Sequence, residues 1–133
     1  MKPSAHLIQI VPARSVAPEG VGDYARLIAE RILAAHGVLT TFISCTPLPP
    51  ENRRRDEWET VELPRRRADD LVAALDAARA RLGNAPILLH LSGYGFHPKG
   101  VPLWVARALE QEVQGPDRRL MTVFHELYAK GPI

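Results

Sequence analysis

Cysteine, aromatic residues and long apolar runs are all scarce in this 133-residue chain. The single cysteine, Cys45, excludes an intrachain disulfide framework and fits a reducing compartment. No apolar run approaches the ~20 residues needed to span a bilayer, and the N-terminus lacks the apolar region and cleavage site of a signal peptide. We therefore expect a cytoplasmic protein.

Few of the aromatic residues lie near the two arginine clusters, Arg53–Arg55 and Arg65–Arg67. The formal net charge is only +2. Basic patches attract phosphate, RNA or anionic membranes, but single-stranded nucleic acid binding also uses aromatic side chains for base stacking. We expect no nucleic-acid partner and interpret the clusters as solvated loops, with peripheral membrane contact left open.

Short β-like runs alternate with longer helical patterns along the whole chain. This alternation predicts an α/β fold with a mostly parallel sheet and helices on both faces. We expect a Rossmann-like, three-layer α/β/α domain with the strand order 3-2-1-4-5, which is usual for that fold. We expect residues 1–133 to form a single domain, with 46–59 as an exposed loop rich in proline and arginine. The expected strands are 6–12, 38–45, 60–64, 86–93 and 118–129, and the expected helices are 21–37, 68–83 and 101–115.

Two of the expected helices have clear apolar faces, and each ends at a glycine, Gly37 or Gly83. In the first helix the face consists of Tyr24, Leu27, Ile28, Ile32 and Leu33. In the second it consists of Leu71, Leu75, Ala78 and Leu82.

A glycine motif precedes the first helix: Gly20-Val-Gly22-Asp-Tyr-Ala25 matches the dinucleotide fingerprint G-x-G-x-x-[GA]. In such a site the first glycine follows the strand almost at once, but here eight residues separate Val11 from Gly20. The second strand also lacks the acidic residue that holds the ribose, since none occurs before Glu51. We therefore expect no cofactor. The motif is either a glycine turn or a helix N-terminus whose amides meet an anion or a sugar hydroxyl.

Three loops should meet at the carboxyl edge of the sheet, where open parallel sheets bind ligands. They are residues 12–23, 92–100 and 125–131, and each contains Gly, His, Tyr or Ser. The loops at the opposite edge look like plain connections. This asymmetry predicts a site at the carboxyl edge.

Two simple chemistries at this edge lack their signatures. Ser92 and His125 suggest a serine hydrolase, but the chain has no G-x-S-x-G there. His90, His97 and His125 suggest a metal site, but His125-Glu126 does not extend to H-E-x-x-H and no cysteine pair assists. We expect no metal, and a histidine at a strand end is also compatible with a structural hydrogen bond.

Residues 17–38, 87–109 and 120–129, which include "PEGVGDYA", "HLSGYGFHPKG" and "VFHELYA", resemble one known family. The chain is similar over nearly its whole length to the N-terminal domain of family 4 glycosyltransferases, which have the GT-B fold. The resemblance implies retaining transfer of a sugar from a nucleotide donor to an acceptor. The reaction takes place in a cleft between two similar domains, of which this chain would form the acceptor-side wall.

The resemblance also assigns residues. His125 matches the strand-end histidine near the transferred sugar and is the candidate catalytic residue, whereas Glu19 departs from the family by replacing a glycine. The candidate substrate- and donor-binding residues are Gly20, Val21, Gly22, Ser92, Gly93, Tyr94 and Glu126.

The expected partners are a nucleotide-sugar donor, held through a C-terminal domain that this chain lacks, and an unknown acceptor. We expect the chain alone to be inactive. An open edge on the last strand, with no helix after it, favours self-association. The alternative function is a stand-alone, non-enzymatic α/β binding or interaction module, because fold alone does not separate the two.

Overall fold

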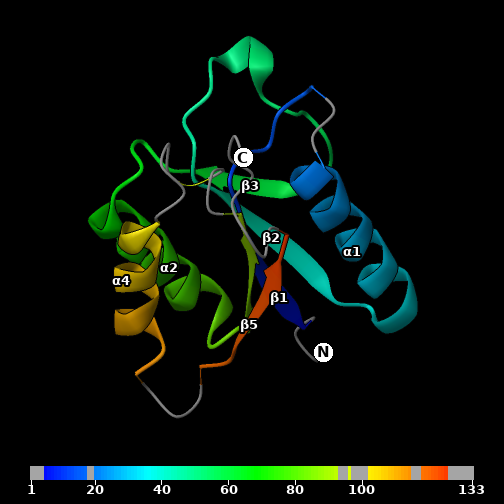
Figure 1. The fold of residues 1–133 in the computed structure, drawn as a ribbon. Helices are drawn as coiled ribbons and strands as arrows, with labels where there is room; N and C mark the ends of the chain where they lie inside the picture. Colours follow the sequence, from blue (N-terminus) through cyan, green and yellow to red (C-terminus); the bar gives the residue numbers. More distant parts are fainter. Residues whose placement is uncertain (1–4, 18–19, 93–95, 97–101, 115–117, 126–133) are drawn as a thin grey trace, which may run out of the picture.

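The computed structural model describes residues 5–17, 20–92, 96, 102–114 and 118–125. Within them, five strands form one all-parallel sheet in the order β3-β2-β1-β4-β5 (Figure 1). The predicted Rossmann-like α/β class and strand order are confirmed. The strands are β1 (His6–Val11), β2 (Leu39–Ser44), β3 (Glu59–Glu62), β4 (Ile87–Leu91) and β5 (Leu120–Phe124). The helices are α1 (Gly20–His36), α2 (Ala68–Leu82), α4 (Leu103–Glu112) and the short 3₁₀ helix η1 (Pro50–Asn52).

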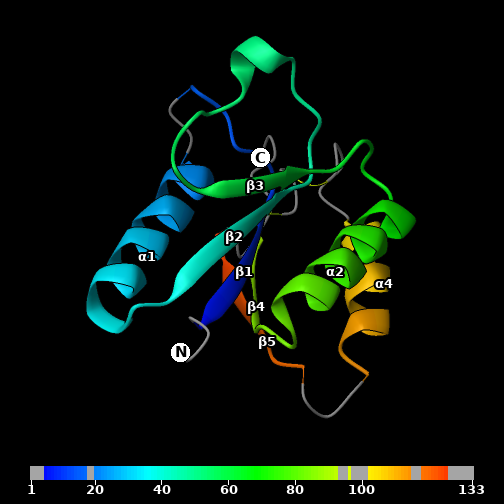
Figure 2. The ribbon, with the colours of Figure 1, turned by 180° about the vertical axis from the view of Figure 1, so that it is seen from behind.

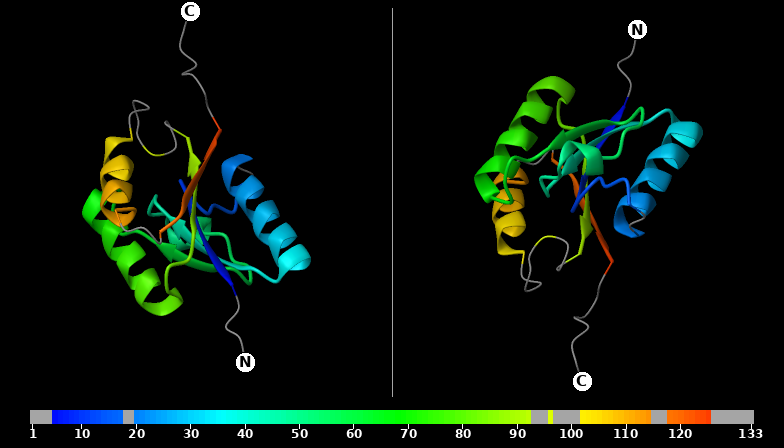
Figure 3. Two further views of the ribbon diagram at one scale, coloured as in Figure 1. Left: turned by 90° about the horizontal axis from the view of Figure 1, so that it is seen from below. Right: turned by 90° about the horizontal axis from the view of Figure 1, so that it is seen from above.

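The sheet lies between two helical layers (Figures 2 and 3). Helix α1 covers one face, while α2 and α4 pack together on the other. The chain order explains this division, since right-handed crossovers put helices on opposite faces when the direction of strand addition reverses. That reversal occurs between β1 and β4.

The larger core lies between the sheet and the α2–α4 layer. The predicted face of α2 is confirmed, because Leu71, Leu75 and Ala78 are buried and Leu82 is partly buried. Strands β1, β2 and β4 meet these residues with aliphatic side chains. The strand residues in this core are Ile8, Ile10, Ile43, Ile87 and Leu89, and α4 adds Val105, Ala108 and Leu109.

The predicted apolar face of α1 is only partly buried. Ala25 and Ala29 make the contact with Val11 and Phe42, whereas Tyr24 remains 46% exposed. Leu27 and Leu33 are also largely exposed, and Ile28 and Ile32 are half-buried. Small side chains allow the helix to approach the sheet closely, so the larger side chains lie on its flanks. The sequence pattern indicated an amphipathic helix correctly but placed its contact stripe at the wrong residues.

Both long helices end at the glycines predicted to end them. Gly37 and Gly83 have φ angles of 69° and 73°, in the left-handed region that favours glycine. Their amides donate to the carbonyls of Leu33 and Arg79, which caps the last turn of each helix. None of the described helices combines the length and apolarity needed to cross a membrane.

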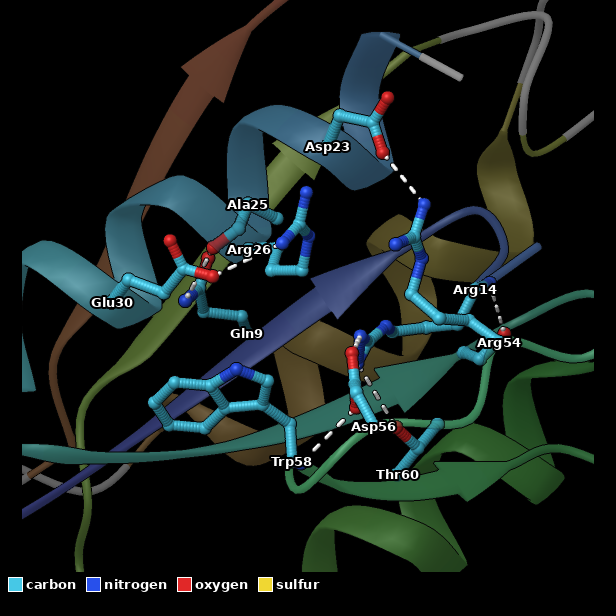
Figure 4. A network of polar contacts seen from close by, with 11 residues as sticks. Gln9, Arg14, Asp23, Ala25, Arg26, Glu30, Arg54, Asp56, Trp58 and Thr60 are labelled. Carbon is cyan, nitrogen blue, oxygen red and sulfur yellow. Dashed lines mark hydrogen bonds and ion pairs between the residues drawn. The ribbon is translucent and has the colours of Figure 1, made fainter. Parts of the chain in front are cut away.

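The proline- and arginine-rich loop between β2 and β3 folds back onto the segment after β1. The amide of Arg54 donates to the carbonyl of Arg14 at 2.9 Å, and Ser15 bridges to Arg53 in antiparallel fashion. The guanidinium of Arg14, only 4% exposed, pairs with Asp56 (Figure 4). It also lies 4.2 Å from the centre of the Phe42 ring. The loop is thereby tied to the start of the site described below.

Burial lowers the pKa of the Arg14 guanidinium, and the Asp56 carboxylate opposes that shift by stabilising the charged form. We therefore expect Asp56→Ala to reduce the free energy of unfolding by roughly 3 kcal/mol, because it leaves a buried cation without its counter-charge. The matched control is Asp70→Ala, whose partner Arg65 is 62% exposed and which should change stability by at most about 1 kcal/mol. Urea denaturation measures both, and equal effects would contradict this view of the loop.

Candidate functional site

The point where the strand order reverses lies between β1 and β4, and open parallel sheets bind ligands at the carboxyl end of such a point. Gln9 on β1 pairs in register with Leu88, so His90 lies one two-residue step further along β4 on the same face. His90 in turn pairs with Val123, which places His125 one step further still. Gln9, His90 and His125 therefore lie on the α1 face of the sheet, each one closer to the carboxyl edge than the one before.

The three side chains form one hydrogen-bonded chain. The side-chain oxygen of Gln9, Oε1, lies 2.6 Å from Nε2 of His90. Nδ1 of His90 lies 3.0 Å from Nε2 of His125. At its other end, the Gln9 amide nitrogen donates to the carbonyl of Ala25 on α1 at 3.2 Å and to the Thr40 hydroxyl at 3.4 Å. These hydrogen bonds therefore connect the backbone of α1, through side chains of β1 and β4, to the residue after β5.

The donor and the acceptor of each hydrogen bond can be assigned by starting from the carbonyl of Ala25. The carbonyl oxygen of Ala25 can only accept, so the Gln9 nitrogen must face it and the Gln9 oxygen must face His90. His90 then carries its proton on Nε2 and accepts at Nδ1, so Nε2 of His125 is the donor. In its neutral form His125 keeps the lone pair on Nδ1. A backbone carbonyl on α1 thereby assigns the tautomer of a ring two strands away.

The middle member of the chain is the most buried. His90 is fully buried, and burial, with a smaller contribution from neighbouring His125, lowers its pKa from 6.5 to about 4. His90 is therefore neutral near pH 7, and it donates to Gln9 and accepts from His125 as the geometry requires. His125 itself is half-buried at the carboxyl edge.

Tyr24, early in α1, packs against both histidines. Its ring meets the His125 ring edge-on, with centroids 5.5 Å apart and planes at 80°, and meets His90 similarly at 6.1 Å and 82°. Edge-to-face contacts of this kind hold aromatic rings in defined orientations. The exposed flank of α1 therefore belongs to the site, which explains why Tyr24 is not in the core.

The glycine motif begins α1 beside this group. Gly20 is the first residue of the helix, has no positive φ, and has no atom within 4 Å of where a Cβ would lie. A turn conformation or a tight contact within the described chain therefore does not require glycine at this position. Val21, Gly22 and Asp23 follow in the first turn. The carboxylate of Asp23 forms an ion pair with Arg54 at 2.9 Å.

The structure brings some predicted site residues together. His125 and the start of α1 with Gly20, Val21 and Gly22 lie at the carboxyl edge on the α1 face, and Ser92 is buried directly after β4. The other predicted site residues, Gly93, Tyr94 and Glu126, lie outside the described residues, as does His97.

Sequence reasoning missed Gln9, and it considered His90 as a metal-ligand candidate or a hydrogen-bonded structural histidine. The available signal was a glutamine at an inward position of the apolar run "HLIQIV", where a buried amide requires partners. Among the described residues, no group of three or more His, Cys, Asp or Glu side chains could hold a metal ion.

Comparisons with family models, curated proteins and solved structures returned no match to this chain. The geometry of the chain itself therefore carries the functional argument.

The lowered pKa of His90 makes a prediction about pH. Between pH 6.5 and about 4, His90 is protonated in the unfolded chain but stays neutral in the folded chain. The free energy of unfolding should therefore fall as the pH falls through this window, by at most about 3 kcal/mol from this residue. In denaturation curves across the window, His90→Gln should flatten the dependence and the exposed control His36→Gln should not. A His90→Gln profile as steep as that of the unsubstituted protein would contradict the assignment.

Proposed function

We propose that this chain forms the acceptor-side wall of a nucleotide-sugar-dependent glycosyltransferase, with His125 contacting the sugar that is transferred. The observation that carries the proposal is the Gln9–His90–His125 chain, which ends at the carboxyl edge beside the point of strand reversal. A buried chain that orients a half-buried imidazole at such a point is typical of a site that must hold a ring in one state.

The chemistry suits a sugar hydroxyl. His125 is held by its hydrogen bond to His90 through Nε2 and by the edge-on contact with Tyr24, so a bound sugar would meet the imidazole in one orientation. An oriented ring positions the reacting sugar, and positioning is a large share of the rate in a transfer between two bound molecules. Gln9 and His90 act through His125 and are positioning residues.

The start of α1 supports the same proposal. The first amides of a helix attract anions, and a phosphate can approach them most closely where no side chain intervenes. Gly20 meets this condition, because nothing in the described chain occupies or requires its Cβ position. Donor phosphates would lie against Gly20 and Gly22, and the sugar would lie against His125 and Tyr24.

In this proposal the nucleotide is held by a second domain, since the described site offers one wall only. The chain by itself then binds nucleotide sugars weakly and transfers nothing, because transfer needs both substrates in one water-poor cleft. The non-enzymatic alternative, a stand-alone binding module, predicts ligand binding by this chain without any transfer in a longer protein.

The test is sugar transfer by the enzyme that contains this domain, with UDP-, GDP- and ADP-sugars as donors. His125→Ala should lower kcat by about 10²-fold or more. It also leaves Nδ1 of buried His90 without its donor, which should cost roughly 1–3 kcal/mol of stability, so circular dichroism must show that the variant is folded at the assay temperature. Gln9→Leu should shift the pH profile of kcat, because it removes the acceptor that assigns the His90 tautomer. The control is His36→Ala, at the far end of α1, with unchanged turnover.

Unchanged turnover in His125→Ala would remove that residue from the site. On the chain alone, amide NMR titration with the same nucleotide sugars should shift Gly20, Gly22 and His125 at millimolar concentrations. Tight donor binding by the chain, or shifts confined to the α2–α4 layer, would contradict the proposed division between two domains.

A further inference from the structure

A hollow lies where α2 and α4 begin, on the face of the sheet opposite to the Gln9–His90–His125 chain. The cavity has a volume of about 510 Å³, within the usual range for small-molecule sites. Its polar lining consists of Arg66, Arg67, Asp69 and Arg107, and Trp104 provides an aromatic wall. The sequence pattern alone had suggested that these arginines belong to a solvated loop.

The arginines that line this cavity differ from most of those near the β2–β3 loop, because they form no ion pair with a carboxylate among the described residues. Around the smaller cavity of about 300 Å³ beside that loop, three of the four lining arginines, Arg14, Arg53 and Arg54, each have a carboxylate partner, and Arg55 has no ion pair among the described residues. Over the residues that the structure describes, no ion pair involves the three arginines of the larger cavity. Arg66 donates only to the neutral hydroxyl of Thr46, at 2.7 and 3.1 Å.

The positive potential of the larger cavity is therefore opposed by a single lining carboxylate, Asp69. The helix starts add to this potential, because neither N-cap residue, Arg67 or Pro102, satisfies a first-turn amide with its side chain. Helix α4 also has no acidic residue in its first turn.

The aromatic wall is held in place. Nε1 of Trp104 donates to the carbonyl of Phe96 at 3.0 Å, and the two rings meet edge-on with centroids 6.2 Å apart. The indole therefore keeps one orientation without a ligand, and a flat group can pack on it with little loss of side-chain freedom. Leu103, 60% exposed, extends the apolar part of the wall.

We propose that this cavity binds a soluble phosphate monoester that carries a flat ring. Arg66, Arg67 and Arg107 would hold the phosphate, since guanidinium groups match phosphate oxygens in paired hydrogen bonds. Trp104 would pack against the ring. This inference is independent of the proposed function, because the cavity lies on the α2–α4 face and shares no residue with the Gln9–His90–His125 chain.

The experiment titrates phenyl phosphate into the full chain and follows Trp104 fluorescence. Trp58→Phe removes the other tryptophan and loses no hydrogen bond, because Trp58 Nε1 has no partner in the described structure. We expect saturable quenching that weakens with added salt. In this background Arg66→Gln with Arg107→Gln should raise Kd about tenfold or more. The control Arg31→Gln removes one positive charge from exposed α1 and is compared with Arg107→Gln alone, which also removes one; it should leave Kd nearly unchanged.

Three results would overturn the proposal: no saturable change at millimolar phenyl phosphate, an equal loss of binding in Arg31→Gln, or binding to phosphatidic acid vesicles without binding to the soluble probe. Circular dichroism checks that each variant folds. If the double variant does not fold, Arg107→Gln alone decides the question, since this exposed side chain lies on the surface of α4 and should still weaken binding.

Discussion

The buried side chain of Gln9 is the interaction on which the arrangement of the candidate site depends. A fully buried amide must find partners for its donors and its acceptor, because an unpaired polar group costs roughly 1–3 kcal/mol in a protein interior. The nitrogen finds the Ala25 carbonyl and the Thr40 hydroxyl, and the oxygen finds His90. One side chain therefore fixes how α1 sits on the sheet and which nitrogen of His90 carries the proton.

The close approach of α1 follows from the same contact. The helix backbone can reach the Gln9 amide only because Ala25 and Ala29 present small side chains to the sheet. The larger Tyr24 is displaced to the flank, where it packs against the two histidine rings. Helix α1 therefore buries less apolar surface than its sequence would allow. In return, its packing places the ring of Tyr24, the first turn of α1 and His125 along one edge of the sheet.

Arginine has two distinct roles in this fold. Arg14 is almost fully buried and needs Asp56, since a guanidinium does not lose its proton at physiological pH and must be neutralised by a neighbour. Arg67 and Arg107 lie at the surface, where water screens their charge and no carboxylate is required. Paired arginines bind the β2–β3 loop to the domain, and uncompensated arginines leave a positive hollow at the starts of α2 and α4.

Much of the fold follows from local pattern. Alternating β-like and helical periods, with Gly37 and Gly83 at the helix ends, were enough to predict the parallel α/β class and the buried face of α2, and the strand order is the usual one for a Rossmann-like domain. The buried face of such a helix is set by the spacing of its apolar residues, and that spacing can be read from a single sequence. The contact stripe of α1 did not follow, because close packing favoured small residues over the most apolar ones.

The polar chain of the site was decided by tertiary structure alone. Gln9 and His90 are separated by 81 positions in sequence, and His90 and His125 by 35. Their contacts require the register of β1, β4 and β5 together with the distance of α1 from the sheet, and no local pattern encodes those quantities. The sequence by itself determined which elements form and that polar residues gather at the carboxyl edge. Only the folded chain decided which of them touch, since hydrogen bonds join side chains across strands whereas periodicity describes single elements.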